Sequence, residues 1–313
     1  MEYRNMGKSG LKVSAVGLGC NNFAIKCDAE QTKAIVNRAL DEGVTLFDTA
    51  DIYGNRGGSE ELLGKALGKR RREVVVASKF GMSMGEGPYL HGASRRYVMA
   101  AAEDSLRRLN TDYIDLYQLH TPDADTPQEE TLEALADLVR AGKVRYLGCS
   151  NFAAWQLAEA LGISRARGLP AYISAQNEYS LLDRHIEREL LPACRHFGVG
   201  ILPFFPLASG FLTGKYRRGA ELPKGTRMAL MERIATRTLT EPNFDLLEKL
   251  ENFARERGHT LLELAVGWLV SEPQNSSVIC GATTPEQVSQ NVKAGEWRLS
   301  AEEREAVGKL THR

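Results

Sequence analysis

The strongest constraint on the fold of this chain is an alternation of short apolar runs with amphipathic helical patterns. The runs lie at residues 15–19, 44–48, 74–79, 113–120, 144–149, 172–175, 199–202 and 278–279. The segments between them carry apolar residues three or four positions apart, which is the period of a helix with one buried face. This alternation predicts a parallel sheet, either closed into a (β/α)8 barrel or left open as a doubly wound sheet.

Polar residues at the ends of the apolar runs favour the barrel. A barrel collects the carboxyl ends of all its strands around one mouth, so polar functional groups recur along the whole chain. Such groups are Asp48, Lys79, His120, Ser150, Asn151 and Gln176. The open sheet would favour a GxGxxG motif after its first strand, where only Gly17-Leu18-Gly19 is present. We therefore expect an α/β fold, with one domain over residues 1–313 formed by a (β/α)8 TIM barrel, an N-terminal β-hairpin over residues 1–14 and two extra helices.

Several helix starts are predicted from capping residues. The predicted starts are a capping box of Asp28 and Gln31, a cap at Ser59 before two acidic residues, a cap at Ser94, Thr126-Pro127 before Gln128 and Glu129, and Thr284-Pro285 before Gln287. Two further helical patterns, at 241–257 and 260–271, follow a long loop that is rich in glycine and basic residues.

The charge balance and the cysteine pattern limit the classes of partner. Forty Lys and Arg residues balance forty Asp and Glu residues, so no net field attracts nucleic acid or an anionic membrane. No run approaches the roughly 18 apolar residues of a membrane span. The five cysteines have no CxxC spacing and the six histidines form no HExxH motif, so neither a disulfide framework nor a metal site is expected. We expect a cytoplasmic protein that acts on a small molecule, as a monomer or a weak homo-oligomer.

The segment FDTADIYG, residues 47–54, places Asp48 at the end of an apolar run and Tyr53 just beyond it. Taken alone, Asp48 could cap a turn, Lys79 could simply pair with a carboxylate, and His120 could be a core histidine. Together they suggest chemistry, because a phenol near a cation and a carboxylate can become a proton donor near neutral pH. An imidazole beside it can hold a carbonyl oxygen.

These residues and further motifs along the chain resemble the aldo-keto reductase superfamily. The resemblance rests on Gly10-Leu11-Lys12-Val13-Ser14, FDTADIYG, Ser78-Lys79-Phe80, Ser150-Asn151-Phe152, residues 210–215 (GFLTGK) and residues 279–291. In its details the chain is most similar to the bacterial general-stress and inositol-cluster branch, which is related to the potassium-channel β subunits.

The resemblance implies an NADP(H)-dependent oxidoreductase that reduces the aldehyde or ketone carbonyl of a small, for example sugar-like, molecule to an alcohol. It implies that Tyr53 is the general acid, Lys79 lowers the pKa of Tyr53, Asp48 pairs with Lys79 and His120 orients the carbonyl. The cofactor contacts that it implies are Gly19, Cys20, Asn21, Asp48, Ser150, Asn151, Gln176, Phe204, Pro206, Leu207, Gly210, Leu212, Lys215, Arg227, Gly281, Thr283, Gln287 and Asn291. The alternative is a cofactor-binding regulatory or redox-sensing subunit with incidental turnover.

Three departures from the family pattern bear on the cofactor. Phe204-Phe205 replaces the usual Tyr-Ser, Cys280 replaces the usual proline, and Thr283 stands where a basic residue often meets the ribose phosphate. We expect stacking on the nicotinamide to survive and the preference for NADP(H) over NAD(H) to be modest. The substrate pocket is expected to be lined by Phe23, Phe80 and Tyr89.

Overall fold

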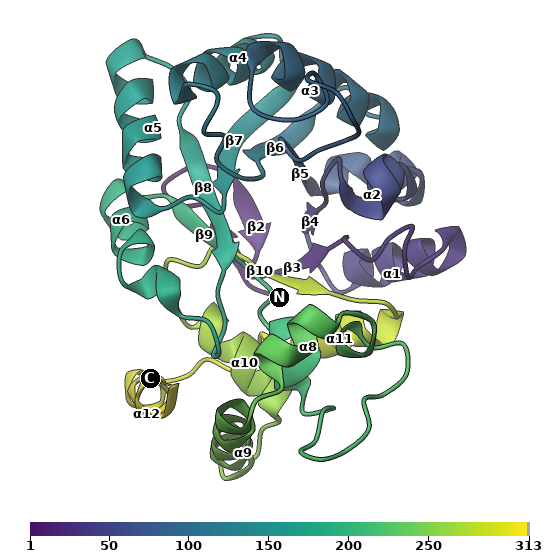
Figure 1. Cartoon of the computed structure of the whole chain (residues 1–313), viewed down its shortest axis with the longest axis vertical. Coiled ribbons are helices and arrows are strands. Elements are labelled where there is room, and N and C mark those ends of the chain that lie inside the picture. The colour runs from purple at the N-terminus through teal and green to yellow at the C-terminus, as the bar shows by residue number, and fades with distance from the viewer. Residues whose placement is uncertain (312–313) are drawn as a thin grey trace.

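A computed structural model, which describes residues 1–311, shows eight parallel strands arranged as a nearly closed barrel (Figure 1). The strands, in their order around the barrel, are β10 (Val278–Gly281), β3 (Val16–Gly19), β4 (Leu46–Asp48), β5 (Val75–Phe80), β6 (Ile114–Leu119), β7 (Val144–Ser150), β8 (Tyr172–Glu178) and β9 (Gly200–Phe204). The remaining gap is bridged by the segment before β10, where Ile201 N–H donates to Gln274 O at 2.9 Å and Ser276 N–H donates to Ile201 O at 2.9 Å. The predicted (β/α)8 barrel is confirmed.

Helices surround the barrel on its outside (Figure 1). They are α1 (Ala29–Asp41), α2 (Tyr53–Leu67), α3 (Arg95–Leu109), α4 (Gln128–Arg140), α5 (Ala154–Arg167), α6 (Leu190–Phe197), α10 (Leu261–Val270) and α11 (Pro285–Ala294). Beyond this ring, α9 (Glu241–Arg255) and α12 (Ala301–Thr311) pack against each other. Short helices α7 (Arg227–Leu230) and α8 (Glu232–Thr238) lie in the long β9–α9 connection, so the chain carries more than the two extra helices expected.

The N-terminal hairpin covers the amino-terminal end of the barrel. It consists of β1 (Tyr3–Asn5) and β2 (Lys12–Ser14), which pair antiparallel as predicted. Met6 and Val13 are fully buried in one cluster with barrel residues such as Leu46 and Leu116. Gly7 has a φ of 56°, and a Cβ there would lie 2.3 Å from the Gly198 carbonyl oxygen. Only glycine therefore lets the hairpin turn approach the barrel this closely.

Side-chain alternation along the strands sorts the barrel interior into an apolar part and a polar part. Val75 and Ala77 on β5 point into the apolar cluster that contains Met6 and Val13, and Lys79 continues the same inward-facing row. On β6, Leu116 and Gln118 follow the same rule. Because alternate residues of a strand face one side, the polar ends of these rows meet at the carboxyl end of the barrel. No helix within residues 1–311 is long and apolar enough to cross a membrane.

The capping predictions succeed at three helices and fail at two. Asp28 and Gln31 form the expected capping box, Ser94 caps α3, and Thr284 accepts a hydrogen bond from Gln287 N at the start of α11. The predicted cap at Ser59 is wrong, because its buried hydroxyl donates to Cys20 O at 2.8 Å. The predicted cap at Thr126 is also wrong, since its hydroxyl donates to Asp123 and helix α4 begins after Pro127 without a side-chain cap.

Candidate active site

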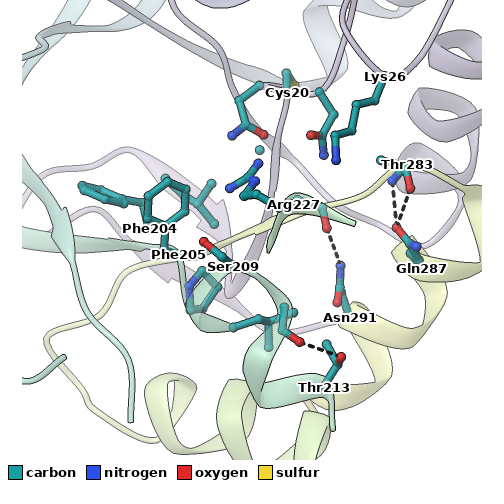
Figure 2. Close-up of a pocket in the computed structure, with 18 of the residues that line it drawn as sticks. Cys20, Lys26, Phe204, Phe205, Ser209, Thr213, Arg227, Thr283, Gln287 and Asn291 are labelled. Atoms are coloured by element: carbon teal, nitrogen blue, oxygen red, sulfur yellow. Dashed lines mark hydrogen bonds between the residues drawn. The ribbon is translucent and has the colours of Figure 1, made fainter. Parts of the chain in front are cut away.

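A cavity of about 1260 Å³ opens at the carboxyl ends of the barrel strands and extends toward α11. Figure 2 shows part of its lining, with Phe204 and Phe205 on one side, Thr283 and Gln287 on the other, and Arg227 between them. The polar strand-end residues Asp48, Ser150, Asn151 and Gln176 all line it. The sequence prediction that polar residues gather at one mouth is therefore correct.

Asp48 and Lys79 form a buried pair at the inner end of this cavity, with the half-buried Tyr53 beside them. The Lys79 ammonium lies 2.6 Å from Asp48 Oδ2, 2.9 Å from Thr49 O and 3.5 Å from the Tyr53 hydroxyl. Lys79 is completely buried and Asp48 is almost so. A buried lysine needs a close carboxylate to stay charged, so Asp48 keeps a cation directly behind the phenol.

The local backbone explains how Tyr53 reaches this cation. Tyr53 opens α2, but residues 54–57 have positive φ values, so the regular helix begins only after them. A Cβ on Gly54 would lie 2.4 Å from Ser59 N, so this turn requires glycine. Ser59, which follows the turn, is hydrogen-bonded to Cys20 O and to the Thr49 hydroxyl, and it thereby ties the turn to the loops after β3 and β4.

The pKa values within this group have opposing causes. Burial raises the pKa of Tyr53 and Lys79 lowers it, while Asp48 raises it further, and the net direction is upward. Lys79 acts in the direction expected from the sequence, but the expected net decrease is wrong because burial outweighs the cation. Burial lowers the pKa of Lys79 while Asp48 and Tyr53 raise it, with a net rise. At neutral pH the phenol therefore carries its proton and the lysine its charge.

His120 lies against the ring of Tyr53, with 5.6 Å between the ring centroids and the rings nearly perpendicular. Burial and the charge of Lys79 lower the pKa of His120 to about 3. Its Nδ1 atom is buried and has no hydrogen-bond partner among the described residues. The imidazole is therefore neutral at physiological pH, a form that can donate one hydrogen bond without adding charge.

Side-chain amides hold the second oxygen of Asp48 and line the adjacent wall. The Gln176 amide donates to Asp48 Oδ1 at 2.8 Å, and Gln118 donates to the same oxygen at 3.3 Å. The Asn151 amide donates to the His120 carbonyl at 2.9 Å and to the Ser150 hydroxyl at 3.1 Å. These bonds use the N–H groups of Gln176 and Asn151 and fix the orientation of their amide oxygens.

Three cations line the middle of the cavity without a carboxylate partner. Within residues 1–311, Lys26, Lys215 and Arg227 form no ion pair, and the Lys26 ammonium donates only to the Gly225 carbonyl, at 3.3 Å. Burial, Arg227 and Lys215 lower the pKa of Lys26, and burial and Arg227 lower the pKa of Lys215. Cations that depress one another's pKa create a positive potential that an anion would relieve.

The residues expected at the far end of the cavity contact one another. The backbone and hydroxyl of Thr283 donate to Gln287 Oε1 at 2.8 and 3.2 Å, and Asn291 donates to the Gly281 carbonyl at 3.3 Å (Figure 2). Lys293 also lines this end. The amino terminus of α11, capped by Thr284 as predicted, borders this end, and helix amino termini favour anions.

Most predicted site residues line the cavity, and five do not: Lys79, Leu212, Phe23, Phe80 and Tyr89. Those that line it are Gly19, Cys20, Asn21, Asp48, Tyr53, His120, Ser150, Asn151, Gln176, Phe204, Pro206, Leu207, Gly210, Lys215, Arg227, Gly281, Thr283, Gln287 and Asn291. Leu212 is fully buried in the hydrophobic core, and its N–H bonds to Leu207 O.

None of the three aromatic residues predicted for the substrate pocket lines this cavity, and the prediction is wrong for Phe23 and Phe80, which are fully buried. Phe80 follows inward-facing Lys79 by one position, so its side chain points away from the barrel interior, where it packs on Tyr117 with 4.8 Å between centroids. Phe23 is fully buried in the same outer core. Tyr89 is 58% exposed, with the Arg96 guanidinium 3.9 Å over its ring.

Sequence reasoning missed Gln118, Lys26 and Phe205 as parts of the site. Gln118 could have been suspected, because it is a polar residue two positions before His120 in an otherwise apolar part of a strand. Lys26 and Phe205 lie on loops whose course no periodicity reveals.

Comparison with known proteins agrees with this geometry. The chain matches the model of the aldo/keto reductase family over residues 15–311. It is 40% identical over 301 residues to a probable voltage-gated potassium channel subunit beta of Arabidopsis thaliana, covering 94% of this chain and 91% of that protein. It is 37% identical over 305 residues to L-glyceraldehyde 3-phosphate reductase of Escherichia coli (strain K12), covering 94% and 87%. It is 33% identical over 329 residues to versiconal hemiacetal acetate reductase of Aspergillus parasiticus, covering 97% and 95%. The chain belongs to the aldo/keto reductase family of oxidoreductases.

Proposed function

We propose that this protein uses NADP(H) to reduce an aldehyde or ketone carbonyl to an alcohol, with Tyr53 as the proton donor. The observation that carries the proposal is the buried Lys79 ammonium, which lies 2.6 Å from Asp48 and 3.5 Å from the Tyr53 hydroxyl. A cation there stabilises the phenolate that forms when the proton leaves. His120, neutral and nearly perpendicular to Tyr53, would donate to the same carbonyl oxygen, and its contact with the Tyr53 ring supports this role.

The donor set of the cavity fits a dinucleotide. The amide oxygens of Gln176 and Asn151 and the hydroxyl of Ser150 suit a carboxamide, and Phe204 offers an aromatic face. Lys26, Lys215 and Arg227 suit a pyrophosphate, because none of them has an ion-pair partner among the described residues. The bound nicotinamide would supply the hydride, and the chain supplies orientation and the proton.

The substrate class is a small carbonyl compound. The relatives' names include an L-glyceraldehyde 3-phosphate reductase and a versiconal hemiacetal acetate reductase, so both a short sugar-like aldehyde and a hemiacetal acetate belong in a test. The proposal also takes residues 1–313 as one functional unit. It further places the protein in the cytoplasm, which five buried cysteines, none in a disulfide, favour.

The test is NADPH oxidation measured across a panel of aldehydes and ketones, including phosphorylated and unphosphorylated trioses. At least one carbonyl compound should accelerate oxidation well above the background in buffer, and Tyr53→Phe should abolish most of that acceleration. A panel in which no compound exceeds the background would remove the reductase proposal.

A second candidate is a cofactor-loaded regulatory or redox-sensing subunit. The observation in its favour is the 40% identity to a probable potassium channel subunit beta over most of both chains. The complete Asp48–Lys79–Tyr53 group favours the enzyme instead. NADPH that binds tightly, together with no turnover of any carbonyl compound, would support the regulatory role.

A further inference from the structure

Phe205 has a backbone conformation that an aromatic residue rarely adopts. It follows the end of β9, lines the cavity and has a φ of 52°. A non-glycine residue in the left-handed region is strained, and bulky residues are uncommon there. Such strain persists where the surrounding structure holds it, often at a functional site.

The ring of Phe205 has two neighbours of different kinds. Phe204 meets it edge to face, with 5.1 Å between centroids, and the Arg227 guanidinium lies 5.2 Å from its centroid. Phe204 holds one edge of the ring, and the guanidinium lies within the range of a cation–π contact. Figure 2 shows these three side chains together in the cavity.

Arg227 has few other contacts that could fix the position of its side chain. It is half-buried, and within residues 1–311 it has neither a carboxylate partner nor a hydrogen bond. It begins α7, which has only four residues and follows the long loop, so its backbone is held by little regular structure. Burial lowers the pKa of Arg227, and Tyr53 and Tyr216 raise it.

We propose that Phe205 is a positioning residue that holds Arg227 over the part of the cavity that takes the cofactor pyrophosphate. This inference rests on the proposed function. The pyrophosphate is common to NADH and NADPH, whereas the 2′-phosphate belongs to NADPH alone. Loss of the Phe205 ring should therefore raise the dissociation constants of NADH and NADPH by the same factor. In the family that this chain resembles a serine is usual at this position, so here an aromatic ring stands where the relatives carry a hydroxyl, and it can hold the arginine by cation–π attraction.

The experiment measures dissociation constants of NADH and NADPH by fluorescence titration for native protein, Phe205→Leu, Phe205→Trp, Arg227→Ala and the double variant Phe205→Leu/Arg227→Ala. Phe205→Leu keeps an apolar side chain and removes the aromatic face, and it should weaken both cofactors about 3- to 10-fold. Phe205→Trp should restore native affinity, because indole is the strongest cation–π platform. In the Arg227→Ala background, Phe205→Leu should have almost no further effect.

Several results would overturn the inference. Equal losses from Phe205→Leu with and without Arg227 would mean that the ring acts elsewhere, for example on the nicotinamide. A loss confined to NADPH would place Arg227 at the 2′-phosphate. Unchanged affinity in Phe205→Leu would remove the role altogether. Thermal unfolding of each variant, with Phe205→Asn added because asparagine tolerates a positive φ, separates relief of backbone strain from loss of the ring. If the native protein binds neither cofactor, the proposed function itself fails, and that outcome is distinct from all of these.

Discussion

The two ends of the cavity differ in how their charges are balanced. At the Tyr53 end, Lys79 is buried with Asp48 2.6 Å away, and both residues come from strands. In the middle and toward α11, Lys26, Lys215 and Arg227 have no ion-pair partner among residues 1–311, and they come from loops or a short helix. The charges at the first end are balanced within the protein, whereas those at the second end are balanced only when an anion binds. The charge pair at the Tyr53 end therefore contributes to the free energy of folding, whereas the unpaired cations contribute to the free energy of binding an anion.

Removal of the Lys79 charge is expected to have the largest effect. Lys79→Met leaves Asp48 buried and unpaired, which typically costs about 3–5 kcal/mol of stability, and it removes the cation behind the phenol, so turnover should fall by at least about 10². Urea unfolding and NADPH oxidation rates measure the two effects.

Lys215→Met is the matched control for Lys79→Met, because it removes a lysine from the uncompensated part of the cavity. It should leave stability unchanged or slightly improved, since Arg227 then has one like charge fewer nearby, and it should weaken cofactor binding. If both variants lose stability equally, the contrast between the two ends is wrong. Near-normal turnover in Lys79→Met would remove the role given to the cation.

The next effect in size is that of Tyr53→Phe. Loss of the hydroxyl should lower turnover by about 10² or more, the scale of general acid catalysis, while the dissociation constant of NADPH changes only a few-fold. Folding should be little affected, because the charge pair of Lys79 and Asp48 stays intact. Steady-state kinetics and cofactor titration are needed together. Parallel losses of affinity and rate would make Tyr53 a structural residue.

His120 predicts a pH dependence of stability. Its pKa in the folded protein is lowered from 6.5 to about 3 by burial and by Lys79, so between these values the unfolded chain binds more protons than the folded one. Stability from this group is therefore present above about pH 6.5 and is lost as the pH falls toward about 3, by at most about 1.4 kcal/mol per pH unit.

The variant His120→Gln isolates this contribution from other titrating groups. Asp51 is one such group, since burial and Glu60 raise its pKa to about 7 and its effect has the opposite sign. The unfolding free energy of the native protein minus that of His120→Gln, measured from pH 7 to pH 4, should decrease as the pH falls. A constant difference would show that the imidazole is not held neutral.

Residues on strands and residues on loops also differ in how well their positions could be predicted from the sequence. Strand periodicity placed Asp48, Lys79 and His120 at one end of a barrel, because alternate residues of a strand have only two directions to point. That rule also identifies the error at Phe80, which must face outward if Lys79 faces inward. Tyr89, Lys26 and Phe205 lie on loops, where contacts between distant segments decide the course of the chain. The upward pKa of Tyr53 depends on the depth of burial, which spacing alone does not reveal.

The smallest expected effect concerns the far end of the cavity and the choice of cofactor. Thr283 and Gln287 are hydrogen-bonded to each other beside the amino terminus of α11, and no arginine stands at position 283. A helix amino terminus offers roughly half a positive charge and free N–H donors to a 2′-phosphate, so the native preference for NADPH over NADH should be modest. Thr283→Arg should widen it by about 1 kcal/mol or less, as is typical of an exposed charge pair, and salt should reduce the gain. Thr283→Gln, which is long but uncharged, is the control for size. The preference is measured from the dissociation constants of both cofactors at low and high salt. A native protein that prefers NADH would show that this end does not bind the 2′-phosphate. The interpretation of the Tyr53 end would still stand.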